Sequence, residues 1–246
     1  MKIGVAQIRL EDSVAINKDK ILKCIDEAIE REVEVLNFPE TALSGYIFEE
    51  FPRMDFIELE EGLAAISGAL KGSSLHVITG TPFREGGELF NSAVVLYPDG
   101  RRLVYHKINL VSYEQNYFAR GSRKVTFEVR GTAFGVMICR DQNSPELAKE
   151  LKEMGVRGLF LLSAHYYELI ESKMKREKNI ALPIARAYEN GLYVFKSNAV
   201  GTLKHRISYG NSMIIDPRGI VVQRAGETQE EMLAYDIDFS RGNPQW

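Results

Sequence analysis

The chain alternates between short apolar runs typical of β-strands and longer runs with apolar residues at helical spacing, and this alternation limits the folds open to it. Lys2 to Ile8 is strand-like, Ile16 to Glu30 is helix-like, and Val33 to Phe38 is strand-like again. The helical run places its apolar residues on one face, namely Ile21, Ile25, Ala28 and Ile29. Strands and helices in alternation predict an α/β fold.

Two tight turns show that the sheets cannot be purely parallel. Pro98-Asp99-Gly100 separates the strand-like runs Phe90 to Tyr97 and Leu103 to Tyr105, and Pro217-Arg218-Gly219 separates Ser212 to Ile215 from Ile220 to Gln223. Each turn predicts an antiparallel hairpin, so the sheets should be mixed. Two sheets between layers of helices satisfy both signals. Further strands are expected at Leu75–Gly80, Val125–Val129, Phe134–Ile138, Leu159–Leu162, Leu192–Ser197 and Met232–Ile237, and further helices at Leu59–Leu70, from Pro145, and up to Gly191.

Length, charge and cysteine content narrow the class of protein. The 246 residues contain no linker or repeat, so one domain over 1–246 is expected. A net charge of -3 with mixed signs argues against nucleic acid as a partner. No run is apolar enough for a membrane span, and the start does not resemble a secretory signal, so we expect a cytoplasmic protein. Cys24 and Cys139 are expected to be free thiols, and the four histidines show no metal-binding spacing, so no metal is expected.

Cys139 has a sequence context that can make a thiol reactive. It follows the predicted strand Phe134 to Ile138, and Ser144-Pro145-Glu146 next to it has the pattern of a helix start. Backbone N–H groups at a helix N-terminus favour a thiolate, so the pKa of this thiol is expected to be lowered. The alternative from this context alone is an inert, buried cysteine.

Three charged residues follow predicted strands and are candidates for the same site. Glu40 lies just past the strand that ends at Phe38, where α/β sheets bind ligands, and partial burial would raise its pKa and suit it as a general base. Lys107 follows the strand Leu103 to Tyr105 and can stabilise an oxyanion. Glu114 is a second carboxylate that can hold Lys107 or the base in place. Each residue alone is also compatible with a solvated surface position.

Two other segments have less specific patterns. His165, Tyr166 and Tyr167 follow the predicted strand Leu159 to Leu162, and we expect His165 and Tyr166 to line a substrate pocket. The basic run Lys173 to Lys178 is better explained as the solvated face of a helix than as a binding patch.

Taken in order, several short motifs resemble the nitrilase or carbon–nitrogen hydrolase superfamily over nearly the whole chain. They are Val5-Ala6-Gln7, Phe38-Pro39-Glu40, Ser44-Gly45-Tyr46, Asn91-Ser92-Ala93, Asp99-Gly100, His106-Lys107-Ile108-Asn109-Leu110, Gly121, Ile138-Cys139-Arg140-Asp141, Pro145-Glu146, Ala185-Arg186-Ala187-Tyr188-Glu189-Asn190, Asn198-Ala199-Val200-Gly201 and Asp216-Pro217-Arg218-Gly219. Each motif is weak alone, but the ordered set is specific.

The resemblance implies a four-layer αββα sandwich and a catalytic triad of Glu40, Lys107 and Cys139, with Glu114 as a second glutamate in the site. It also implies no metal, no organic cofactor, and a homodimer or larger homo-oligomer. The pattern further places an acid and an arginine as a buried pair beneath the site, here Asp141 and Arg186.

Departures from the family pattern bear on the substrate. Arg140 stands where many members have an aromatic residue, so it is a candidate for substrate binding and the pocket rim should be more polar. Nitrile-cleaving members continue from the cysteine with Trp-Glu-Asn, whereas this chain has Arg140-Asp141-Gln142. The resemblance therefore favours a small amide or N-carbamoyl substrate, cleaved through a cysteine thioester. A glutaminase that supplies ammonia, an acyltransferase, and a catalytically silent scaffold stay open as alternatives.

Overall fold

The computed structural model describes residues 1–239, and these form two mixed six-stranded sheets covered by helices. The first sheet has the order β14-β1-β2-β3-β4-β5 and the second β13-β12-β9-β8-β7-β6. The strands are β1 (Lys2–Gln7), β2 (Val35–Asn37), β3 (His76–Glu85), β4 (Glu88–Leu96), β5 (Arg102–His106), β6 (Thr126–Val129), β7 (Thr132–Ile138), β8 (Gly158–Ser163), β9 (Tyr193–Asn198), β10 (Val200–Leu203), β11 (Arg206–Tyr209), β12 (Met213–Ile215), β13 (Val221–Arg224) and β14 (Glu231–Asp236).

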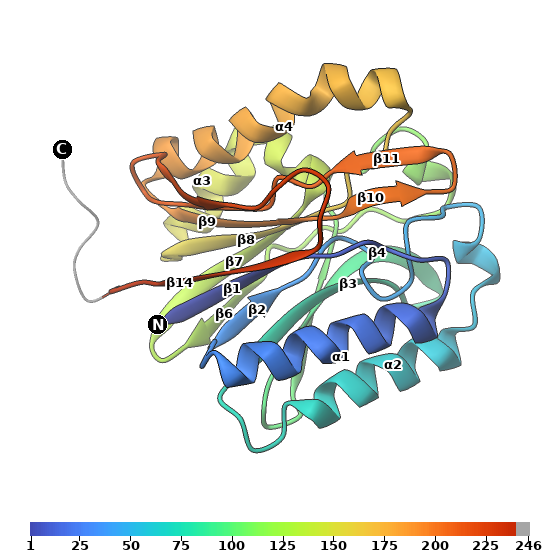
Figure 1. Cartoon of the computed structure of the whole chain (residues 1–246), viewed down its shortest axis with the longest axis horizontal. Coiled ribbons are helices and arrows are strands. Elements are labelled where there is room, and N and C mark those ends of the chain that lie inside the picture. The colour runs from blue at the N-terminus through green and yellow to red at the C-terminus, as the bar shows by residue number, and fades with distance from the viewer. Residues whose placement is uncertain (240–246) are drawn as a thin grey trace.

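Four layers are stacked in the order helices, sheet, sheet, helices. Helices α1 (Val14–Glu30) and α2 (Phe56–Ala69) cover the first sheet, and α3 (Pro145–Glu153) and α4 (Leu169–Asn190) cover the second (Figure 1). The three central strands of each sheet run parallel. They are β1, β2 and β3 in the first sheet and β7, β8 and β9 in the second, and the outer strands of both sheets pair antiparallel. The predicted αββα sandwich with mixed sheets is confirmed.

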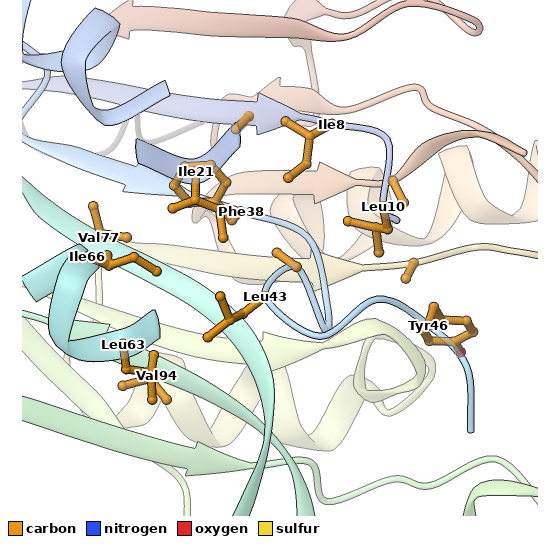
Figure 2. Packing of buried hydrophobic residues seen from close by; sticks show 14 of the residues in the cluster. Ile8, Leu10, Ile21, Phe38, Leu43, Tyr46, Leu63, Ile66, Val77 and Val94 are labelled. Carbon is orange, nitrogen blue, oxygen red and sulfur yellow. The ribbon is translucent and has the colours of Figure 1, made fainter. Parts of the chain in front are cut away.

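Alternation along each strand divides the apolar residues among three cores, because successive side chains point to opposite faces of a sheet. In β1, Ile3 and Val5 enter the core between the two sheets, and Ala6 enters the core under α1 and α2. Figure 2 shows the latter core, where side chains of the helices pack on those of the sheet. Among them are Ile21, Leu63 and Ile66 from the helices, Val77 and Val94 from the sheet, and Phe38 directly after β2.

Both predicted hairpins are present, β4 with β5 and β12 with β13. Several details differ from the sequence-based expectation. Strand β2 is shorter than Val33 to Phe38, and Ile29 is exposed because it lies at the border of the buried face of α1. The hairpins β3–β4 and β10–β11 were not predicted.

The predicted single domain over 1–246 includes 240–246, which lie outside the described residues. Within residues 1–239, none of the helices combines the length and apolarity needed to cross a membrane.

Candidate active site

Glu40 is held in a tight turn directly after β2. The residue after it, Thr41, has a φ of 50°, which is a strained conformation for a residue with a side chain. The turn lies against Gly80 of β3, where an added Cβ would come within 2.2 Å of the Thr41 nitrogen. Only a glycine at position 80 therefore allows the turn to pack so closely on the sheet. Sequence reasoning did not find this role, because Gly80 has no motif of its own.

Lys107 lies between two buried carboxylates. Its Nζ donates hydrogen bonds of 2.7 Å to Glu40 Oε1 and of 2.7 Å to Glu114 Oε1. All three side chains are fully buried. Asn91 on β4 ties the cluster together, since its Nδ2 donates to Glu40 at 2.8 Å and to Glu114 at 3.1 Å. The structure thus brings together three residues that the sequence suggested separately, and it adds Asn91, which the sequence showed only as part of a motif.

The charges of this cluster set the protonation of its members. Burial raises the pKa of Glu40, with a further rise from Glu114, while Lys107 works in the opposite direction. Burial alone would lower the pKa of Lys107, but the carboxylates of Glu40 and Glu114 outweigh it and hold the pKa well above its usual range. Lys107 is therefore a fixed ammonium, and Glu40 has a higher affinity for a proton than an exposed glutamate. The direction of the Glu40 pKa shift is the one expected from the sequence.

Cys139 lies in the sharp turn that connects β7 to a 3₁₀ helix, Cys139–Asn143. Its φ is 45°, so the nucleophile candidate occupies a strained backbone position like Thr41. The start of α3 is as predicted, with Ser144 accepting a hydrogen bond from the Leu147 N–H. The predicted lowering of the thiol pKa is wrong. Burial raises the pKa of Cys139, and the charge of Glu40 raises it further, so the resting group is a thiol that needs a base.

Asp141 fastens the turn that carries Cys139. Its Oδ2 accepts hydrogen bonds from the Tyr105 hydroxyl at 2.7 Å and from the Ile138 N–H at 2.9 Å, and its Oδ1 accepts one from the Asn109 N–H at 2.8 Å. The nucleophile turn and the loop after Lys107 are thereby joined by one side chain.

The predicted pair of Asp141 with Arg186 is wrong. The Arg186 side chain bonds instead to the Gln142 carbonyl oxygen at 2.9 Å and to the Glu189 carboxylate on the same helix. Asp141 receives three uncharged donors in place of a guanidinium. Arg186 still supports the site, because it holds the backbone of the 3₁₀ helix that follows Cys139.

Asp141→Asn should lower kcat about 10²-fold, since an amide nitrogen would replace one acceptor oxygen and leave a buried N–H without a partner. The loop after Cys139 would then shift by a fraction of an ångström. Steady-state kinetics, together with a thermal melt, would measure this. The exposed residue Asp99 provides a control, and Asp99→Asn should leave kcat unchanged. Wild-type kcat in Asp141→Asn would show that the hydrogen bonds of this side chain do not position the site.

A pocket of about 430 Å³ opens above Cys139. His165 and Tyr166 line it as expected, although the Tyr166 hydroxyl is already bonded to the Val200 carbonyl oxygen at 3.3 Å, so it acts mainly in packing. Arg140 is exposed and lies at the rim. The interpretation of Lys173 to Lys178 as only a solvated face is wrong in part, because Lys175 and Lys178 also line the pocket. The sequence could not show this role of Lys175 and Lys178, because it depends on how α4 packs beside the pocket.

A second arrangement of catalytic residue types lies away from this pocket. Ser92 Oγ is 2.7 Å from His106 Nδ1, and His106 Nε2 is 3.0 Å from Glu85 Oε2. Ser92 is completely buried, so no substrate can reach its hydroxyl. The three side chains therefore brace β3, β4 and β5 and form no active site.

Comparisons with known proteins bear on the whole chain. The model of the family described as carbon–nitrogen hydrolase matches residues 2–244. A nitrilase from Pyrococcus abyssi is 31% identical over 91% of this chain and 84% of its own length. An omega-amidase from Mus musculus is 27% identical over 98% of this chain and 89% of its own length.

Two other matches concern the fold and a larger relative. A solved structure of a mutant Nesterenkonia AN1 amidase from the nitrilase superfamily superposes with a TM-score of 0.88 at 20% identity, over 98% of this chain and 91% of that one. The chain also matches 40% of the length of a glutamine-dependent NAD⁺ synthetase from Aquifex aeolicus, at 28% identity over 91% of this chain.

Proposed function

Because this chain belongs to the carbon–nitrogen hydrolase family, we propose that it hydrolyses a small amide or N-carbamoyl compound through a thioester on Cys139. The observation that carries the proposal is the buried cluster of Glu40, Lys107 and Glu114 beside a thiol at the floor of an open pocket. Glu40 supplies a base of raised proton affinity, and Lys107 supplies a fixed positive charge. A protonated thiol needs both groups to cleave a carbon–nitrogen bond, because the base takes its proton and the charge stabilises the oxyanion.

In the first half of the reaction, Glu40 takes the proton of the Cys139 thiol, whose pKa the charge of Glu40 raises. The sulfur attacks the carbonyl carbon, and the carbonyl π electrons move to the oxygen. Two of the three N–H bonds of Lys107 are directed at carboxylates, so the third is left for this oxyanion. The backbone N–H of Arg140 is the second donor. A donor of this kind contributes about 3 kcal/mol to the stability of the transition state.

In the second half, the oxyanion collapses and the carbon–nitrogen bond breaks. Glu40 gives its proton to the departing nitrogen, which leaves as ammonia or an amine. The carboxylate of Glu40 then takes a proton from a water molecule that attacks the thioester. The acid is released, and the proton returns to the sulfur of Cys139. Glu114 takes no proton in this scheme, and it serves with Asn91 to hold Lys107 and Glu40 in place.

An amide is favoured over a nitrile by the residues after the nucleophile, Arg140-Asp141-Gln142, which depart from the nitrile-cleaving pattern. Relatives named as amidases support the same choice, whereas two relatives are named as a nitrilase and a probable nitrilase. The resemblance to glutamine-dependent NAD⁺ synthetases favours a second candidate, in which glutamine is the amide and ammonia is the useful product. Both candidates use the same chemistry at Cys139.

The proposal is tested by ammonia release from a panel of ω-amides, glutamine, short aliphatic amides, N-carbamoyl compounds and nitriles. We expect turnover of at least one amide or N-carbamoyl class at rates well above those for the matching nitriles. Added hydroxylamine should divert the thioester to a hydroxamate in proportion to its concentration. Turnover of nitriles alone would refute the proposed substrate class. Turnover without a hydroxamate at any hydroxylamine concentration would argue against the thioester.

A further inference from the structure

A proline interrupts the backbone hydrogen bonding of α4 beside the candidate active site. Pro183 lies inside this helix, which spans Leu169–Asn190. Proline has no backbone N–H, so it cannot donate the helical hydrogen bond to the carbonyl oxygen four residues before it. That carbonyl belongs to Asn179, which is buried. A buried carbonyl oxygen without a partner is costly, so another donor is expected to replace the missing N–H.

Lys196 on β9 is that donor. Its Nζ donates a buried hydrogen bond of 2.9 Å to the Asn179 carbonyl oxygen. Lys196 is paired with Leu161 on β8 and with Met213 on β12, and both of these residues pack in the core under α3 and α4. Side chains of directly paired residues share one face of a sheet. The lysine side chain therefore crosses an apolar core to reach the helix.

The surroundings of Lys196 suit a hydrogen-bond donor better than a charge. In the part of the chain that the structure describes, no carboxylate forms an ion pair with it. Burial lowers the pKa of Lys196 to about 7, so its positive charge is not stabilised in this core. An uncharged amine keeps N–H bonds, and the hydrogen bond to Asn179 persists when the group loses its proton.

The N-terminal half of α4, residues 169–179, depends on polar contacts of this kind. Within residues 1–239, this half contributes no side chain to the three apolar cores, and its two buried residues are Ser172 and Asn179. Ser172 donates a long hydrogen bond of 3.4 Å to a carbonyl oxygen of β11. An ion pair of Arg176 with Glu227 is partly exposed and screened by water. The buried bond to β9 is therefore the strongest of these polar links.

This N-terminal half forms one wall of the pocket above Cys139. Four of its side chains line the pocket, namely Glu171, Lys175, Lys178 and Asn179. The helix beyond Pro183 has a different task, because Arg186 donates a 2.9 Å hydrogen bond to the Gln142 carbonyl oxygen in the 3₁₀ helix after the nucleophile. Pro183 thus separates a half that supports the nucleophile from a half that forms the pocket wall.

We propose that Lys196 replaces the helical hydrogen bond that Pro183 removes, and that it thereby positions the N-terminal half of α4 as the pocket wall. Lys196 is a positioning residue, because it acts on the pocket through Asn179 and takes no part in the proposed reaction. Its effect on substrate binding rests on the proposed amide hydrolysis, whereas its link to Pro183 does not. Loss of the bond should loosen the wall and weaken substrate binding, while the proposed catalytic groups, which lie on other elements, stay in place.

The test is a double-mutant cycle of Lys196→Met and Pro183→Ala. Lys196→Met alone leaves the Asn179 carbonyl oxygen without a partner, and it should raise KM for the best amide of the panel about 10-fold and change kcat less than about 2-fold. Pro183→Ala supplies a backbone N–H that can donate to the same carbonyl oxygen. In the Pro183→Ala background, Lys196→Met should therefore change KM less than about 2-fold.

The outcomes of this cycle decide the proposal. Equal increases of KM in both backgrounds would show that Lys196 does not act through the Asn179 carbonyl oxygen. A loss confined to kcat would place Lys196 in the chemistry instead of the pocket wall, and the proposal would be wrong. If Lys196→Met alone does not fold, its combination with Pro183→Ala should fold, and a combined variant that also fails to fold would overturn the proposal.

Two exposed residues provide matched controls. Lys204→Met removes an exposed lysine on the β10–β11 turn and should leave KM unchanged. Pro52→Ala replaces an exposed proline outside α4 and should not relieve the effect of Lys196→Met. If Pro52→Ala relieves that effect as fully as Pro183→Ala does, a general gain in stability explains the rescue and the proposal is wrong.

Hydrogen exchange tests the same link without a substrate. Lys196→Met should speed the exchange of the backbone amides of residues 173–179 about 10-fold and leave β7 and β8 unchanged, and Pro183→Ala should reverse the change. Unchanged exchange of residues 173–179 in Lys196→Met would overturn the proposal. If no amide of the panel is hydrolysed but exchange follows this pattern, the proposed function fails and the link of Lys196 to Pro183 stands. If amides are hydrolysed and the two substitutions act independently, the proposed function stands and the link fails.

Discussion

Cys139→Ala should lose at least about 10⁴-fold in kcat, since no other nucleophile can form the thioester. The substitution removes a single sulfur atom, so the melting temperature and circular dichroism should stay close to those of the wild type. Cys139→Ser should be nearly as inactive, because a hydroxyl in the same strained turn is a far weaker nucleophile at neutral pH. Ammonia release on the best substrate of the panel measures both variants.

Cys24→Ala is the matched control for this experiment. Cys24 lies on α1, partly buried against the core under that helix, and burial with the charge of Glu27 raises its pKa to about 12. We expect full activity in this variant and a small loss of stability from the missing sulfur contacts. An inactive but well-folded Cys24→Ala, or full activity in Cys139→Ala, would show that the mechanism uses the wrong cysteine.

Glu40→Gln should lower kcat about 10³-fold, because an amide of the same shape cannot take the proton of Cys139. The wild-type rate should fall at acid pH as Glu40 becomes protonated. Burial raises the pKa of Glu40, so this acid limb should lie above the range of an ordinary glutamate, and it should be absent from the residual activity of the variant. A pH–rate profile of both proteins measures this.

The exposed residue Glu61 on α2 provides the control for charge, and Glu61→Gln should keep both the rate and the acid limb. An acid limb that persists unchanged in Glu40→Gln would assign the titration to another group. A loss in Glu40→Gln of less than about 10-fold would remove Glu40 from the role of general base.

The sequence predicted the layers and pointed to most residues of the candidate site because those features depend on local patterns. Period-two apolar runs and two Pro/Gly turns were enough for the mixed sheets, and the segments that carry Glu40, Lys107 and Cys139 all follow strands. Their meeting in space was implied only by the resemblance to a family, since 67 residues separate Glu40 from Lys107 and 32 separate Lys107 from Cys139, which leaves no local signal.

Other features depend on packing that no local pattern encodes. The hydrogen bonds of Asp141 to Tyr105 and Asn109 join segments more than 30 residues apart. The pairing of Asp141 with Arg186 was predicted incorrectly because the motif gives the residue types and not their positions in space. The direction of the Cys139 pKa shift was mispredicted because the helix start was visible in the sequence and the burial was not. The homodimer stays a prediction. Exposed Ile170 and Met174 on α4 give it a candidate surface.

The raised pKa of the Cys139 thiol also affects how readily the protein is oxidised when no substrate is bound. Peroxide oxidises the thiolate form of cysteine, and the sulfenic acid so formed can proceed to irreversibly oxidised states. Burial and the nearby Glu40 carboxylate keep Cys139 protonated at rest, although the pocket above it is open. In the proposed mechanism, the sulfur gains nucleophilic character only while its proton is on Glu40, with an acceptor carbon already in place. We therefore expect peroxide to oxidise Cys139 slowly in the absence of substrate.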